Sequence, residues 1–114
     1  MDVKLVDKPI SRQQLKDAAQ ELYGDMVKAV VDVAKNIMAI GGELHADEEA
    51  FLLQSNSRQE DLWGINLYPD QDLPEMVEFD SMINIRPRQN NRSRSVEDQS
   101  LREKIVAIVG ALVQ

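Results

Sequence analysis

The residues best suited to chemistry are four arginines that fall within nine positions of an otherwise acidic chain. Arg86, Arg88, Arg92 and Arg94 lie among amides, serines and other mostly polar residues, while the 114 residues together carry a formal net charge of −7. Planar guanidinium groups hold phosphate and carboxylate through paired hydrogen bonds. The spacing predicts an anion-binding site in this arginine segment (residues 84–95), where Arg86, Arg88 and Arg92 converge with Asn91 on one anionic group.

A competing interpretation of the arginine segment needs no ligand. Residues 43–80 contain eleven acidic residues against a single base, Arg58, so their net charge is −10. The arginines could pair with these acids at the surface, where each exposed ion pair contributes about 0–1 kcal/mol. The acidic total also argues against a general nucleic-acid binder, which must neutralise many phosphates. It leaves an anionic small molecule or a short nucleic acid as possible partners.

A second candidate group is formed by Glu43, His45, Asp47 and Glu49. In an extended chain their side chains would share one face, where Glu43 and Asp47 could bind Mg²⁺ or Mn²⁺ and His45 could act as a general base. If a helix begins near Asp47 instead, the acids are first-turn charges, and the pattern of residues 46–54 favours this interpretation. A catalytic zinc is not expected, because the chain has one histidine and no cysteine. No cofactor is otherwise evident.

Two asparagines are expected beside these groups. Residues 62–68 predict a strand that turns its tryptophan and aliphatic residues to the core and Asn66 to the opposite face. Residues 77–85 predict another strand, whose polar face carries Asn84 as well as the first arginine of the arginine segment. If the two polar faces coincide, both asparagines would contact the ligand.

The remaining periodicities complete an α+β fold. Ser11 and Gln14 have the spacing of a capping box at the start of a helix. The other predicted elements are that helix over residues 11–23, a hairpin of strands 26–33 and 37–40, a helix or strand continuation over 46–54, a C-terminal helix capped by Ser95 or Asp98, and an edge strand within 1–6. Together they predict one domain over residues 1–114, with an antiparallel sheet of about four strands and two or three helices packed mainly on one face.

Size and composition indicate a soluble protein. A chain of 114 residues is long enough to bury one hydrophobic core. It has no apolar run near the ~20 residues that a membrane span needs, no basic and apolar leader, and no cysteine for disulfides. We therefore expect a cytoplasmic protein that does not enter a membrane.

Three segments carry a resemblance to a known family. They are GGELHAD at residues 41–47, LWGINLYP at 62–69 and INIRPRQNNRS at 83–93. They resemble those of a small, functionally uncharacterised bacterial domain family with cyanobacterial members. The resemblance covers nearly the whole chain and implies no activity, so it assigns no site residue.

Three functions fit these observations. The first is a non-enzymatic domain that binds an anionic ligand through the arginine segment, with Asn66 and Asn84 nearby. The second is a small Mg²⁺- or Mn²⁺-dependent phosphohydrolase or nuclease built on Glu43, His45 and Asp47. The third is a homodimer in which the acidic surface of one copy meets the arginine segment of another.

Overall fold

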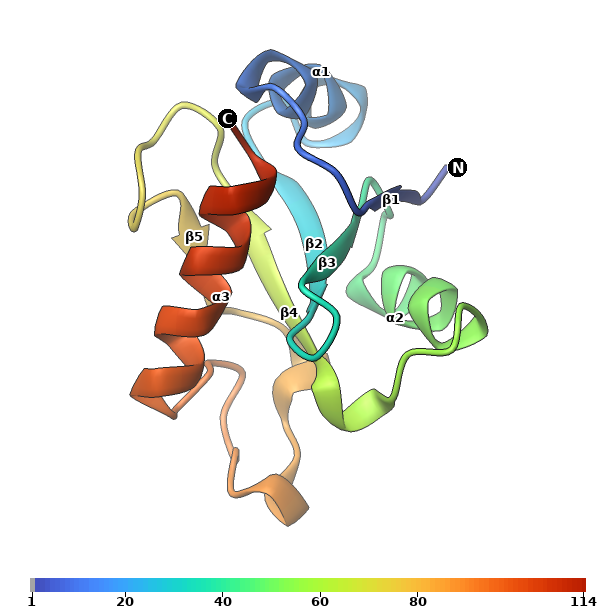
Figure 1. Ribbon diagram of the computed structural model, residues 1–114, viewed down its shortest axis with the longest axis vertical. Coiled ribbons are helices and arrows are strands. Elements are labelled where there is room, and N and C mark those ends of the chain that lie inside the picture. The colour runs from blue at the N-terminus through green and yellow to red at the C-terminus, as the bar shows by residue number, and fades with distance from the viewer. Residues whose placement is uncertain (1) are drawn as a thin grey trace.

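Five short strands form the antiparallel sheet on which the rest of the protein is built. The computed structural model describes residues 2–114 and orders the strands β1-β3-β2-β4-β5 (Figure 1). The strands are β1 (Lys4–Val6), β2 (Val27–Asp32), β3 (Ile37–Ile40), β4 (Leu62–Leu67) and β5 (Val77–Glu78). The predicted α+β class and antiparallel sheet are confirmed. The edge strand is confirmed as β1, and Met1 of its predicted range lies outside the described residues.

Helices cover both faces of the sheet. α1 (Arg12–Leu22) and α3 (Gln99–Leu112) pack on one face, where the larger hydrophobic core forms. α2 (His45–Gln54) packs on the other face, where Leu52 contributes to a smaller core with Val30 of β2. Figure 1 shows α3 and α2 on opposite sides of the strands. α2 therefore faces the polar positions of the central strands.

The alternation of side chains along the central strands explains these two cores. Ala29 and Val31 of β2 join Trp63 and Ile65 of β4 in the core under α1 and α3, as the period of two predicts. The intervening residues turn to the face of α2. Lys28 pairs in register with Asn66 on that face. A charged residue and an amide thus replace aliphatic side chains beside α2.

The first helix follows its sequence signals closely. The Ser11 hydroxyl accepts a hydrogen bond from the Gln14 N–H at 3.0 Å, and the Gln14 side chain accepts one from the Ser11 N–H at 2.8 Å. This is the predicted capping box. At the other end of the chain Asp98, not Ser95, caps α3 by accepting from the N–H groups of Ser100 and Leu101.

The prediction for residues 46–54 resolves to a helix. α2 begins at His45, so the alternative of a strand continuation is wrong. The cap position is Leu44, and Asp47 is the third helical residue, whose carboxylate accepts from the Leu44 N–H at 3.3 Å. Asp47 therefore acts from inside the first turn and not as the cap itself.

No helix formed by residues 2–114 has both the length and the apolar character that crossing a membrane requires.

The predicted strand over residues 77–85 is wrong beyond Glu78. The chain leaves the sheet and forms 3₁₀ turns at Met82–Asn84 and Pro87–Gln89. The reason lies at Gly64 of β4, whose N–H and carbonyl groups are paired by the side chain of Asn84. Gly64 also lets Ser81 approach closely, since an added Cβ would lie 2.5 Å from the Ser81 hydroxyl oxygen. The Asn84 side chain thus makes the hydrogen bonds to β4 that the main chain of a longer β5 would make.

Loss of the helix cap should lower the stability of the fold. We expect Ser11→Ala to reduce the free energy of unfolding in urea by about 1 kcal/mol, because the Gln14 N–H loses its acceptor. Ser11→Asp is the control, since it keeps an acceptor and adds a charge that the helix N-terminus favours. An equal loss in both variants would contradict this role of the cap.

Candidate functional site

Arg86, the first member of the arginine segment, is turned into the protein. Its guanidinium group donates to the carbonyl oxygens of Gln59, at 2.6 Å, and of Leu62. Its central carbon lies 4.0 Å from the centre of the Trp63 ring, a cation–π geometry. Burial lowers the pKa of Arg86, and the nearby charge of Glu49 opposes this. The donors of Arg86 are therefore largely engaged in holding the loop before β4.

Asn91 also has internal partners. It is 3% exposed, and its amide nitrogen donates to the carbonyl oxygens of Asn84, Ser93 and Ser95 at 2.7, 3.2 and 2.7 Å. Its amide oxygen accepts from the N–H of Glu97 at 2.9 Å. The Asn91 side chain thus bonds only to groups of residues 84–97 and holds this loop closed.

Asn84 is fully buried and joins this loop to the sheet. Its oxygen accepts from the Gly64 N–H at 2.8 Å, and its nitrogen donates to the carbonyl oxygens of Gly64 and Arg94 at 2.9 and 3.0 Å. The Asn84 side chain is thus committed to the fold, although it was expected to contact a ligand beside Asn66. Asn84 faces backbone groups on every side.

The other arginines point in different directions. Arg88 and Arg92 are exposed, and the main-chain N–H of Arg92 donates to the Glu97 carboxylate at 3.0 Å. Arg94 instead reaches back toward the sheet, where its Nε donates to Asp80 Oδ1 at 2.6 Å. Of the four arginines, Arg94 is the one that lines the pocket on the α2 face.

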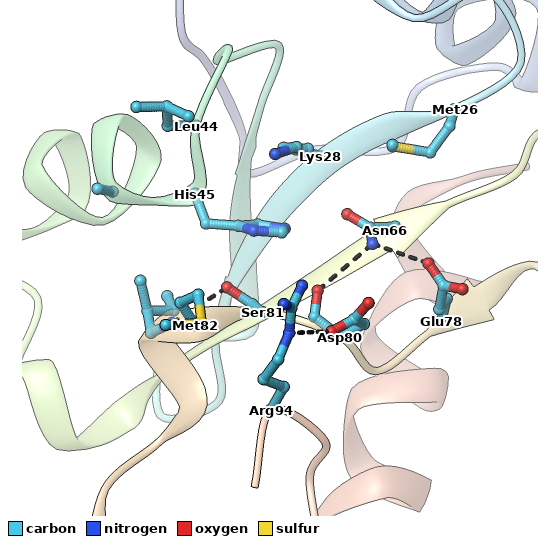
Figure 2. Close-up of a pocket in the computed structure, with 12 residues that line it drawn as sticks. Met26, Lys28, Leu44, His45, Asn66, Glu78, Asp80, Ser81, Met82 and Arg94 are labelled. Carbon is cyan, nitrogen blue, oxygen red and sulfur yellow. Dashed lines mark hydrogen bonds and ion pairs between the residues drawn. The ribbon is translucent and has the colours of Figure 1, made fainter.

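That pocket brings His45 and Asn66 together with one of the four arginines, so we take it as the candidate site. It has a volume of about 450 Å³ and lies between the start of α2, the central strands and the segment after β5 (Figure 2). Its lining combines cations, carboxylates, an amide, an imidazole and apolar residues: Met26, Lys28, Leu44, His45, Ala46, Asn66, Glu78, Asp80, Ser81, Met82, Ile83 and Arg94. Residues 41–47 and 83–94 therefore both contribute to this pocket, His45 from the first segment and Arg94 from the second.

His45 is the first residue of α2 and is held in one orientation. Its Nε2 lies 2.8 Å from the carbonyl oxygen of Ile65, and because a carbonyl only accepts, Nε2 carries the proton. Burial lowers the pKa of His45; the bond to Ile65 opposes this, and the charge of Lys28 adds to it. The ring is therefore neutral near pH 7. A role as general base stays a prediction.

Lys28, Asn66 and Glu78 form one row across three adjacent strands. Lys28 of β2 pairs with Asn66 of β4, and Asn66 pairs with Glu78 of β5. The amide nitrogen of Asn66 donates to Glu78 Oε1 at 2.8 Å (Figure 2). The amide oxygen of Asn66, a residue that is 7% exposed, accepts no hydrogen bond of regular geometry among the described residues, although the Asn66 side chain lies close enough to His45 to raise the pKa of that imidazole. We call these three residues the polar row.

A buried carboxyl group lies behind the pocket. Glu48 of α2 is fully buried and accepts from the Gly42 N–H at 2.9 Å, while its second oxygen has no partner within residues 2–114. Burial raises the pKa of Glu48 to about 9, although the bond from Gly42 and the charge of Lys28 oppose this. Glu48 is therefore protonated and uncharged at neutral pH. Gly42 must be small here, because an added Cβ would lie 2.9 Å from the Glu48 side chain.

The residues predicted to bind a metal do not lie in one extended segment. Because α2 begins at His45, the extended spacing that would align Glu43, His45, Asp47 and Glu49 does not occur. Asp47 binds the Leu44 N–H. The carbonyl oxygen of Glu43 accepts the Tyr23 hydroxyl. No group of three or more acidic or histidine residues among residues 2–114 has the arrangement of a metal site.

Sequence reasoning identified His45 and Asn66 but missed Lys28 and Glu78. Lys28 was visible as one of two charged residues, with Asp32, in an otherwise apolar stretch of strand, at a position opposite to the core. Glu78 could be placed beside Asn66 only through the register between β4 and β5, which the sequence specifies weakly.

The chain belongs to the family described as protein of unknown function (DUF5674), which matches residues 4–112. The resemblance to an uncharacterised family is thereby confirmed. The comparison with curated proteins finds no match. The comparison with solved structures finds none either.

Removing the Asn84 side chain should destabilise the whole fold. In Asn84→Ala the Gly64 N–H and two carbonyl groups lose their partners inside the protein, and each unsatisfied buried group costs about 1–3 kcal/mol. We expect the free energy of unfolding in urea to fall by at least about 2 kcal/mol.

Asn90→Gly is the matched control for this variant. Asn90 is exposed in the same loop with a φ of 59°, a conformation that glycine adopts without strain. Its effect should stay within about 0.5 kcal/mol. Similar losses in the two variants would contradict the structural role of Asn84.

Glu48→Gln should stabilise the protein in a pH-dependent way. Between the ordinary pKa of 4.5 and the folded value of about 9, the folded state holds a proton on Glu48 that the unfolded chain releases. The stability contributed by Glu48 is therefore complete below pH 4.5 and falls as the pH rises. The advantage of the variant should grow by roughly 1 kcal/mol per pH unit across this range.

The measurement is urea unfolding of both proteins from pH 4 to pH 9. Glu21→Gln, at an exposed position of α1, should show no such trend. A difference between Glu48→Gln and the parent protein that does not change with pH would show that Glu48 is ionised in the fold.

Proposed function

We propose that this protein is a non-enzymatic domain that binds a small molecule bearing an anionic group, and that it does so in the pocket beside α2. The proposal keeps the predicted ligand chemistry but moves the site from the arginine segment to the sheet. Its principal support is Lys28, a half-buried cation on the pocket wall. Its Nζ lies 5.5 Å from the centre of the Tyr23 ring.

The unpaired state of Lys28 is the observation that carries the proposal. Neither an ion pair nor a hydrogen bond of its ammonium group occurs within residues 2–114. A partly buried charge without a counter-ion is unfavourable, because burial removes its hydration. An anionic ligand would supply the missing charge in a cavity where water screens it less than at the open surface.

The first turn of α2 adds donors to the same wall. Leu44, His45 and Ala46 line the pocket at the point where the helix begins. The first N–H groups of a helix have no partner within it, and the helix dipole favours negative charge there. The N–H of Asp47 is used by the carbonyl oxygen of Leu44. The groups of His45 and Ala46 are therefore the ones suited to an anion.

The arginine segment supports this site indirectly. Arg86 and Asn91 are occupied by backbone groups, whereas Arg94 lines the pocket and keeps Asp80 paired. The pocket volume of about 450 Å³ suits a small molecule better than a nucleic-acid strand. Arg88 and Arg92 remain the exposed alternative for anion binding, so they belong in the test.

Matched ligands and variants test the proposal. We expect 4-methylpentanoate to bind at least tenfold more tightly than 4-methylpentanamide, measured by amide chemical shifts that change at residues 44–46. Inorganic phosphate should shift the same signals. Lys28→Met should remove the preference for the carboxylate, because the cation that recognises it is gone.

Two controls locate the site. Lys104→Met removes a lysine from α3, on the opposite face of the sheet, and should leave binding unchanged. The double variant Arg88→Ala/Arg92→Ala should also bind normally. Loss of binding in the double variant with normal binding in Lys28→Met would place the anion at the arginine segment, and absence of binding by every anion would refute the proposal.

A further inference from the structure

We infer that the ligand of this pocket is a zwitterion of the amino-acid class, with an ammonium group bound by Glu78 and a carboxylate bound by Lys28, and with an apolar side chain. This inference rests on the proposed function and narrows its ligand. It starts from the polar row, which runs across three adjacent strands. The row has a cation on β2 at one end and an anion on β5 at the other.

Glu78 is the acidic counterpart of Lys28. Its Oε1 accepts hydrogen bonds from the Asn66 amide at 2.8 Å and the Tyr68 hydroxyl at 3.2 Å. No cation pairs with its carboxylate within the described residues, in contrast to Asp80, which is paired with Arg94. Two charges of opposite sign therefore line one pocket without neutralising each other (Figure 2).

The polar row keeps the two charges close together on the sheet. Adjacent strands lie about 4.8 Å apart, so the backbones of Lys28 and Glu78 are separated by about 10 Å. Both side chains line the same pocket, so one small ligand that carries a carboxylate and an ammonium group can reach both. An amino acid carries these two groups. A diamine or a dicarboxylate has the wrong charge for one of the two ends.

Asn66 explains why the two ends stay apart. It lies between Lys28 and Glu78 in the polar row, and its nitrogen is committed to Glu78 and to the Asp80 carbonyl oxygen. Its oxygen is turned away from Glu78, toward the His45 ring. Asn66 thus holds Glu78 in place.

Apolar residues at the pocket suit the rest of an amino acid. Leu44 and Met82 line the pocket although 56% and 65% of their surfaces are exposed, and Met26 lines its opposite part. Flexible methionine side chains adapt to ligands of different shape. An aliphatic side chain would cover Leu44 and Met82 and remove their apolar surface from water.

Three ligands that differ by one charge test the inference. They are L-leucine, 4-methylpentanoate, which lacks the ammonium group, and L-leucinamide, which lacks the carboxylate. We expect calorimetry at pH 6.5 to show L-leucine binding at least tenfold more tightly than either of the others. Each of the other two ligands pairs with one end of the polar row and leaves the other end without a counter-ion.

Charge-removing variants assign each end. Glu78→Gln keeps the shape and the hydrogen bond to Asn66, and it should reduce L-leucine binding at least tenfold while leaving 4-methylpentanoate unchanged. Lys28→Met should weaken both carboxylates and leave L-leucinamide unchanged. Glu75→Gln, an exposed position just before β5, is the control and should change none of the three affinities. Circular dichroism spectra verify that each variant is folded.

The outcomes separate this inference from the proposed function. If 4-methylpentanoate binds as tightly as L-leucine and Glu78→Gln affects neither, the ligand is a simple anion: the inference is overturned and the proposed function stands. If no carboxylate binds, both are overturned. If L-leucine binds tightly but Glu78→Gln has no effect, the assignment of the ammonium group to Glu78 is wrong.

Discussion

The pairing of the Asn84 side chain with the backbone of Gly64 is the interaction on which the rest of this structure depends. It supplies the hydrogen bonds that another strand would otherwise give to β4, so the sheet narrows to a two-residue β5. The chain is then free to leave the sheet and return, with Asn91 closing the loop. A buried amide whose bonds are all made inside the protein fixes such a path strongly, because leaving them unmade is costly.

This path determines what the α2 face can do. By ending β5 early, it brings Asp80, Ser81 and Arg94 to the rim of a pocket whose floor is polar. On the other face the same strands carry only core residues, and α1 and α3 cover them. The two sides of the sheet therefore differ. One side buries the larger hydrophobic core, and the other combines a smaller core with a lysine, an imidazole and an amide at buried or half-buried positions.

Local signals in the sequence were enough for α1, the β2–β3 hairpin and β4, because each is defined by caps or by alternation within a few residues. The segment after Glu78 was mispredicted for a physical reason: Ile83 and Ile85 alternate as in a strand, but the bonds that decide the path come from Asn84 to a strand twenty residues earlier. The contact of Arg86 with Trp63 is equally non-local, and nothing nearby in the sequence shows it. Two residues of the candidate site, His45 and Asn66, could be predicted from the sequence. Placing Lys28 and Glu78 beside them required the register of three strands.

The polar row has a consequence for how the protein forms. Its three members come from strands that are distant in sequence, and the pocket wall opposite them belongs to a loop made still later in the chain. During synthesis from the N-terminus, Lys28 and His45 emerge well before Glu78 and Arg94 exist. The pocket is therefore among the last features to assemble, and contacts of such long range are slow to form. A molecule that fits it would bind only completed chains and would hold both halves of the protein together against unfolding and proteolysis.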